Sequence, residues 1–230
     1  MQFDILTIFP NLFNSFLNES LIKKSLQKKV NKICVHDLRV WSEGKHKQVD
    51  DRPYGGGAGM VLMAEPIIKA IQEIKLKRSK KIKIILLSPQ GKQFDQKMAQ
   101  RFSKLDQLIL ICGRYQGVDA RIEKFIDEKV SVGPYILSGG ELPAMILTES
   151  VARLIPGYLG NPKSLEDETF SGKKSLNITW PQYTRPEILK VRNKKYSVPK
   201  ILLSGDHKKI KEWKKHQIMK ALKHKSKKIK

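Results

Sequence analysis

Three glycine-containing segments follow short apolar runs and have the composition of ligand-binding loops. They are Leu87-Ser-Pro-Gln-Gly91, Cys112-Gly-Arg-Tyr-Gln-Gly117 and residues 132–143. Each preceding run has the length of a buried strand, so the segments are expected at the carboxyl ends of strands. In α/β proteins ligands bind at that edge of the sheet, where the backbone groups of several loops surround one molecule. The pattern predicts a small-ligand site without naming the ligand, and ordinary strand-to-helix turns are the alternative.

The motifs of several common enzyme classes are absent. The run Gly55-Gly-Gly-Ala-Gly59 is followed by Met60 where the dinucleotide-binding motif needs its third glycine, and no phosphate-binding P-loop is found. The sequence also lacks the serine elbow of α/β hydrolases and the H-E-x-x-H helix of zinc proteases. Dinucleotide binding, ATP binding and these types of hydrolysis are therefore not expected.

Cysteine and histidine have no recognisable ligand spacing. Cys34 and Cys112 lie far apart, and the five histidines are scattered. Neither a disulfide framework nor a metal site is expected, and a reducing cytoplasm is the expected compartment. No apolar run approaches the roughly 18 residues that a membrane span needs, so no membrane association is expected.

The charge is strongly positive and is concentrated in the last quarter of the chain. The 230 residues include 45 Lys or Arg and 22 Asp or Glu, a net charge of +23. Residues 176–230 hold 17 basic and 3 acidic residues, a net charge of +14. Such an excess predicts an anionic partner. The candidate phosphate contacts are Lys208, Lys209, Lys211, Lys214 and Lys215.

The hydrophobic pattern alternates between two periods. Short β-branched and leucine-rich runs predict strands over 3–9, 33–40, 82–87, 108–112 and 130–132. Amphipathic segments predict helices over 11–30, 64–77, 93–102, 118–126 and 141–154. This alternation predicts an α/β fold with a parallel sheet covered on both faces.

Three regions follow from the composition. Residues 1–160 form the predicted α/β domain. Residues 161–175 lack periodic apolar positions and contain an acidic stretch, as in a flexible linker. In residues 176–230, a helix is expected from Asp206 with Ile210 and Trp213 on its apolar side, which predicts a small basic helical domain ending in a lysine-rich tail.

Several motifs together resemble a known family. Besides the loops at 87–91 and 112–115, they are Asp50-Asp-Arg-Pro-Tyr-Gly-Gly-Gly-Ala-Gly-Met60, Leu137-Ser-Gly-Gly-Glu-Leu-Pro-Ala-Met145, Arg153-Leu-Ile-Pro-Gly157 and Tyr183-Thr-Arg-Pro186. In order and spacing they resemble the bacterial tRNA (guanine-37 N1) methyltransferases of the SPOUT superfamily. The resemblance implies a parallel sheet with a deep trefoil knot, S-adenosylmethionine as methyl donor, and a homodimer whose active site the second subunit completes. It also implies a tRNA substrate with guanine at position 37, next to the anticodon.

The resemblance further implies the residues of the site. By position, those that bind S-adenosylmethionine would be Leu87, Pro89, Gly113, Tyr115, Val132, Gly133, Pro134, Tyr135, Ile136, Leu137, Gly139, Gly140 and Pro143. Arg153 matches the family's catalytic arginine. The family's Asp-Ser-Phe stands here as Glu168-Thr169-Phe170, preceded by Asp167. Ungapped spacing from Arg153 favours Glu168 as general base, and Asp167 is the alternative.

These residue types suit methylation of a base nitrogen. Guanine N1 carries a proton at neutral pH, which a carboxylate can remove, and a guanidinium can stabilise the negative charge left on the base. A non-catalytic RNA-binding protein and a SPOUT enzyme acting on another RNA position are the competing hypotheses. The Arg153 and carboxylate pair favours chemistry at N1, because a binding module needs neither.

Overall fold

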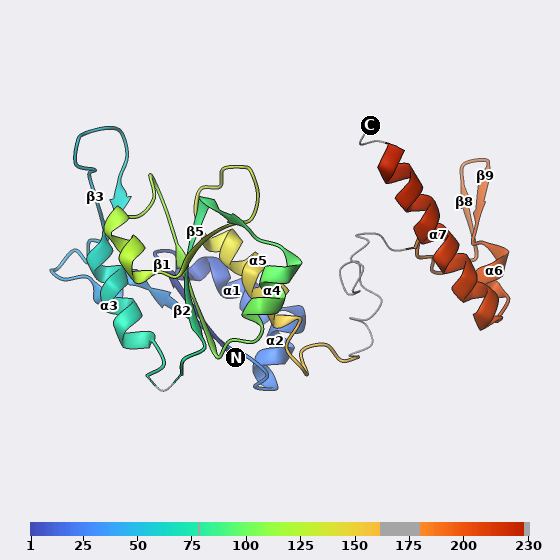
Figure 1. Cartoon of the computed structure of the whole chain (residues 1–230), viewed down its shortest axis with the longest axis horizontal. Helices are drawn as coiled ribbons and strands as arrows, with labels where there is room; N and C mark the ends of the chain where they lie inside the picture. The colour runs from blue at the N-terminus through green and yellow to red at the C-terminus, as the bar shows by residue number, and fades with distance from the viewer. Residues whose placement is uncertain (78, 162–179, 228–230) are drawn as a thin grey trace. The chain divides into compact units, whose positions relative to one another are not determined.

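The computed structural model describes residues 1–77, 79–161 and 180–227, with side chains up to Ala221. The chain divides into two units, Met1–Gly160 and Asn161–Lys230. The first unit contains the large sheet with its covering helices, and the second contains a hairpin and two helices (Figure 1).

A five-stranded parallel sheet forms the centre of the first unit. Its strands are β1 (Gln2–Thr7), β2 (Lys32–Asp37), β5 (Ile82–Gln93), β6 (Gln107–Cys112) and β7 (Glu128–Ser131). They lie in the order β2-β1-β6-β5-β7, and every neighbouring pair is parallel. The expected α/β fold with a parallel central sheet is thereby confirmed. Every residue of β6 is buried, as expected for a central strand covered on both faces.

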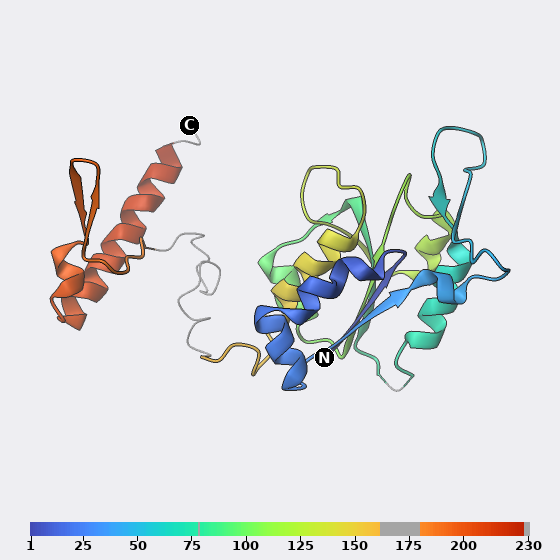
Figure 2. The same cartoon turned by 180° about the vertical axis from the view of Figure 1, so that it is seen from behind.

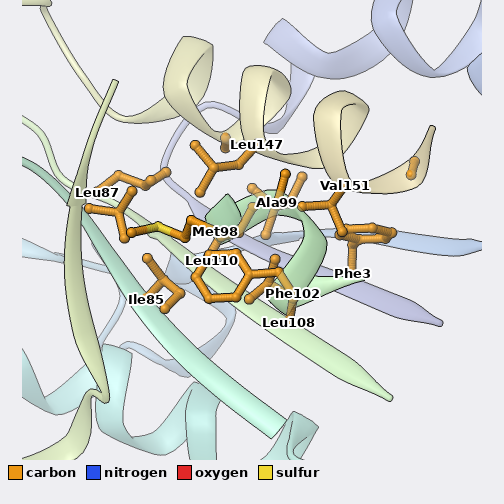
Figure 3. Close-up of a cluster of buried hydrophobic side chains, with 14 of the residues drawn as sticks. Phe3, Ile85, Leu87, Met98, Ala99, Phe102, Leu108, Leu110, Leu147 and Val151 are labelled. Atoms are coloured by element: carbon orange, nitrogen blue, oxygen red, sulfur yellow. The ribbon is translucent and has the colours of Figure 1, made fainter. Parts of the chain in front are cut away.

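Alternate residues of the strands point to opposite faces of the sheet, and helices cover both faces. One face packs against α4 (Gln96–Phe102) and α5 (Glu141–Ala152). Figure 3 shows the side chains of this contact: from the sheet Phe3, Ile85, Leu87, Leu108 and Leu110, and from the helices Met98, Phe102, Leu147 and Val151. The other face packs against α3 (Ala64–Ile74) and the short 3-10 helix η3 (Ala120–Phe125) through Leu6, Ile84, Leu86, Ile109 and Ile111.

The prediction of a single helix over 11–30 is wrong. That segment forms a 3-10 turn η1 (Pro10–Phe13) and two helices, α1 (Asn14–Asn18) and α2 (Ser20–Gln27). Glu19 has an extended backbone and Ser20 has a φ of 53°, so the helical hydrogen bonds cannot continue across this point. In Figure 2 the blue α1 and α2 lie on the same side of the sheet as the yellow α5, and Phe13 and Ile22 belong to the same core cluster as Leu147.

Three other elements differ from expectation because of local polar contacts. The segment expected as a helix over 118–126 is η3, which begins where the Asp119 carboxylate accepts the N–H of Arg121. Strand β2 ends at Asp37, whose carboxylate starts the 3-10 turn η2 (Leu38–Trp41) by accepting the N–H of Arg39. Helix α4 begins only after Asp95, whose side chain accepts the N–H of Met98.

The second unit combines a hairpin with helices. The hairpin joins β8 (Ile188–Val191) to β9 (Lys194–Ser197). It was not predicted from the hydrophobic pattern. After α6 (Lys200–Leu203), the helix expected from Asp206 is present as α7 (His207–Lys227), and the Asp206 carboxylate accepts the N–H of Lys209 in its first turn. Among the described residues, no helix is both long enough and apolar enough to cross a membrane.

Candidate functional site

A pocket of about 480 Å³ lies beside the ends of β6 and β7 and the middle of β5. It is lined by twelve of the thirteen residues expected to bind the methyl donor: Leu87, Pro89, Gly113, Tyr115, Val132, Gly133, Tyr135, Ile136, Leu137, Gly139, Gly140 and Pro143. Pro134 is exposed and is not among the lining residues. The structure therefore brings the three glycine-containing segments together around one cavity, as the sequence predicts.

The first of these segments is a bulge and not a loop after a strand. Leu87 and Lys92 of β5 both pair with Val130 of β7, so the four residues between them are left out of the ladder. Three of them, Ser88, Pro89 and Gln90, line the pocket. The expected end of the strand at residue 87 is thus wrong, since β5 resumes pairing and continues to Gln93.

The segment before α5 passes directly against the end of β6. The Gly140 N–H donates to the carbonyl of Gly113 over 2.9 Å. A Cβ atom at position 140 would lie 2.6 Å from the Cα of Cys112, a separation that real side chains do not reach. Only glycine permits this approach, which joins two of the pocket's walls by backbone contact.

A buried ion pair lies behind the same walls. Glu141 is 2% exposed; its Oε2 accepts from Arg114 Nε over 2.9 Å and its Oε1 accepts from Thr7 Oγ1 over 2.7 Å. The Arg114 guanidinium also lies 4.6 Å from the centre of the Phe9 ring. These contacts connect β1, the loop after β6 and the first turn of α5. Burial, and next the charge of Glu141, raise the pKa of the Cys112 thiol well above its ordinary value.

Sequence reasoning did not assign a role to Glu141. The sequence feature that could have indicated a buried ion pair is an acidic residue at the start of an otherwise apolar helical segment. The same feature is explained equally well by a favourable contact between a carboxylate and the helix dipole. An arginine directly after a strand, as Arg114 is, suits either phosphate binding or a helix cap. The structure pairs its Nε with Glu141 and places the residue in the pocket wall.

The Asp50–Met60 motif lies beside the pocket. Its ends form a small hairpin of β3 (Asp50–Asp51) and β4 (Val61–Leu62). Leu62 N–H donates to the carbonyl of Gly117 over 3.0 Å, and Gln116 N–H donates to the carbonyl of Met60 over 3.1 Å. The carboxyl end of the motif is therefore held next to the loop that follows β6, whereas Tyr54 and the glycines at 55–57 are exposed.

The structure does not bring Arg153 to the pocket of its own chain. Arg153 caps the carboxyl end of α5, whereas Gly140 and Pro143 at the other end line the pocket. The ten residues from Pro143 to Arg153 span about 15 Å of helix. At that far end, burial and the charge of Glu149 raise the pKa of Tyr158 to about 12, and the charge of Arg153 opposes the shift. Glu168 and Asp167 lie outside the described residues.

The buried carboxylate gives a direct stability test. Replacing Glu141→Gln removes the charge that faces Arg114 and weakens two buried hydrogen bonds, so the free energy of unfolding should fall by about 1–3 kcal/mol. Urea denaturation measures the change. Glu149→Gln, on an exposed position of the same helix, is the matched control and should change stability by less than about 0.5 kcal/mol. Equal stability of the two variants would contradict a structural role for the ion pair.

Comparison with known proteins agrees with the resemblance of the motifs. The family model described as "tRNA (Guanine-1)-methyltransferase TrmD" matches residues 1–229. A tRNA (guanine-N(1)-)-methyltransferase of Dictyoglomus turgidum is 45% identical over 96% of this chain and 86% of its own length. Proteins of the same name from Ruminiclostridium cellulolyticum and Listeria innocua are each 47% identical, over 94% and 96% of this chain and 91% and 88% of their own lengths. The chain therefore belongs to the tRNA (guanine-1)-methyltransferase family.

Proposed function

We propose that this enzyme transfers a methyl group from S-adenosylmethionine to N1 of guanine at position 37 of tRNA. The observation that carries the proposal is the pocket built from the β5 bulge and the segments after β6 and β7, in a chain that belongs to a tRNA guanine-N1 methyltransferase family. A purely RNA-binding role does not account for that family membership.

The pocket suits the methyl donor in size and lining. Its volume of about 480 Å³ lies within the roughly 300–1,000 Å³ of sites for small ligands. Leu87, Ile136 and Leu137 offer apolar surface for an adenine ring, and the neighbouring glycines offer backbone groups without side-chain obstruction. We assign the knot of the SPOUT superfamily to the same loops. The backbone contact at Gly140 supports this, because a threaded chain must pass close to other backbone segments.

The reaction needs a base and a stabilising cation from the protein. S-adenosylmethionine, when bound, would supply a methyl group from its positively charged sulfur, which keeps the electron pair of the broken carbon–sulfur bond and becomes a neutral thioether. A carboxylate, Glu168 or alternatively Asp167, removes the N1 proton of guanine so that the nitrogen lone pair can form the new bond. Arg153 stabilises the negative charge that then develops on the base and its O6 atom.

The position of Arg153 supports a homodimer in which each subunit completes its partner's site. Arg153 stands about one helix length from the pocket of its own chain. On the same helix, Leu142 and Ile146 are 58% and 43% exposed one turn apart, which leaves apolar surface for a second copy. A two-fold interface over this face would exchange equivalent residues between the subunits.

The second unit supports tRNA binding. Lys208, Lys209, Lys211 and Lys215 are exposed on α7, and Lys214 lies with its Nζ 4.3 Å from the centre of the Trp180 ring. We assign methyl-donor binding to residues 1–160, the general base to the linker over 161–175, and tRNA binding to residues 176–230, with a cytoplasmic location where tRNA is modified. Lysine-rich surfaces bind the phosphate backbone and contribute most strongly at low salt.

The substrate assignment is tested with two tRNA transcripts that differ only at position 37. With labelled S-adenosylmethionine, the transcript carrying guanine there should accept one methyl group, and the transcript carrying adenine should accept none above background. Mapping the labelled nucleotide confirms the position. Equal labelling of the two transcripts would contradict the assignment of position 37.

The general base is tested by isosteric amides. Glu168→Gln should lower kcat by about 10²–10⁴-fold, because the amide cannot accept the N1 proton, while binding of S-adenosylmethionine is retained. Asp167→Asn is the matched control and should retain most of the turnover. If Asp167→Asn alone abolishes turnover, Asp167 is the base and the ungapped alignment from Arg153 is wrong.

Completion of the site by the partner is tested by mixing two inactive variants. Arg153→Ala retains the pocket but lacks the arginine. Gly113→Val fills the pocket but retains the arginine. This variant should fold, because a Cβ at position 113 would make only ordinary contacts, 3.4 Å from the Leu87 carbonyl oxygen. After co-refolding, mixed dimers hold one complete site each, so about a quarter of the wild-type activity should return. No recovery would mean that Arg153 acts within its own chain.

A further inference from the structure

Three potential metal ligands lie together on strands β1 and β2, away from the pocket. In the parallel pairing, Asp4 stands opposite Cys34, and His36 follows two residues later on the same face of β2. A carboxylate oxygen, the Cys34 sulfur and a ring nitrogen of His36 all lie within 4.8 Å of one another. About thirty residues separate Asp4 from the other two, so sequence spacing gave no sign of the cluster.

The carboxylate of Asp4 is held in one orientation. Its side chain is 1% exposed, and its Oδ2 accepts from Gln2 Nε2 over 2.8 Å and from Gln107 Nε2 over 2.7 Å. Its Oδ1 faces His36 Nε2 at 2.8 Å. Two amides therefore fix the carboxylate while one oxygen points at the imidazole. Metal-binding carboxylates are commonly oriented by outer hydrogen bonds of this kind.

We propose that Asp4, Cys34 and His36 bind a divalent ion of the zinc type, with a water molecule as fourth ligand. Sulfur, imidazole nitrogen and carboxylate oxygen are the ligand atoms of protein zinc sites, whereas Mg²⁺ and Ca²⁺ prefer oxygen alone. On binding, the Cys34 thiol releases its proton to solvent and the ion bonds to the freed sulfur, to an oxygen of the Asp4 carboxylate and to one ring nitrogen of neutral His36, whose proton stays on the other ring nitrogen. The thiolate and the carboxylate then balance the charge of the ion.

The geometry requires little rearrangement. Zinc bonds of about 2.0–2.3 Å at tetrahedral angles place ligand atoms about 3.4 Å apart. The oxygen and nitrogen of Asp4 and His36 are now 2.8 Å apart, and the sulfur lies within 4.8 Å of both. Small side-chain rotations bring all three into range. The His36 side chain is 24% exposed, so an ion and its water ligand can enter from solvent.

The consequence would be structural. Among the described strands, β2 lies at the edge of the sheet and has β1 as its one neighbour. An ion shared by the two strands would link this edge to the centre of the sheet. The site is separate from the methyl-donor pocket, because none of its three residues lines that pocket.

The test uses the full chain, stripped of metal and titrated with Co²⁺ as a spectroscopic probe. Wild type should bind one Co²⁺ per chain, with a thiolate-to-cobalt charge-transfer band and the visible absorption of tetrahedral cobalt. Added Zn²⁺ should displace the Co²⁺ and abolish both absorption features, whereas Mg²⁺ should leave them unchanged. Cys34→Ser should lose the charge-transfer band, and His36→Asn, which removes a ligand, should weaken binding by more than the roughly 10–100-fold that loss of a ligand's outer hydrogen-bond partner costs. His216→Asn, on an exposed position of α7, is the matched control and should bind as wild type does.

A second measurement guards against variants that fold poorly. Zn²⁺ should raise the Tm of wild type and of His216→Asn, and leave the Tm of Cys34→Ser unchanged, with all three showing the same circular dichroism before metal is added. A charge-transfer band that survives in Cys34→Ser would assign the ion to Cys112, the other cysteine of the chain, and overturn the proposal. The absence of any band in wild type would also overturn it.

Discussion

The backbone contact between Gly140 and the end of β6 is the constraint on which the pocket depends. It exists only because position 140 has no side chain: a Cβ there would lie 2.6 Å from the Cα of Cys112. The contact brings the segment before α5 against the loop that follows β6, and the bulge of β5 closes the cavity from the other side. Three segments that are distant in sequence thereby share one small volume. Adding even a methyl group would separate two of them.

The ion pair of Glu141 and Arg114 stabilises that arrangement from behind. A buried charge is costly without partners, and Glu141 has two, one on the loop after β6 and one at the end of β1. The pair therefore couples the position of α5 to the centre of the sheet. The same helix places Arg153 at its opposite end, so the rigidity that shapes the pocket also keeps the arginine away from it within one chain. Under the proposed function, catalysis would depend on association of two chains.

The course of the strands and of the longer helices was predictable from the sequence, because hydrophobic periodicity reflects which residues are buried. The parallel sheet, α3 and α5 follow directly from it. The failures occurred where a local feature interrupts the periodicity: a positive φ, a capping carboxylate or, in β5, a bulge. The apolar spacing over 11–30 continues through Ser20, yet a positive φ there ends one helix and begins another. Likewise Asp119 converts an apparent helix into the 3-10 turn η3 by accepting a backbone N–H. Side-chain capping of this kind leaves little trace in an apolar pattern.

By itself the sequence determined the class of fold, the family, and the three segments that surround the pocket, since apolar runs and glycines are local features. Only the tertiary structure decided which side chains meet. The pairing of β1 with β2 brings Asp4 to Cys34 and His36, and the approach of α5 to β6 buries Glu141 against Arg114. It also decided that β5 continues beyond the first segment, which becomes a bulge. These relations depend on strand register and on the packing of helix against sheet, which residue spacing along the chain does not encode.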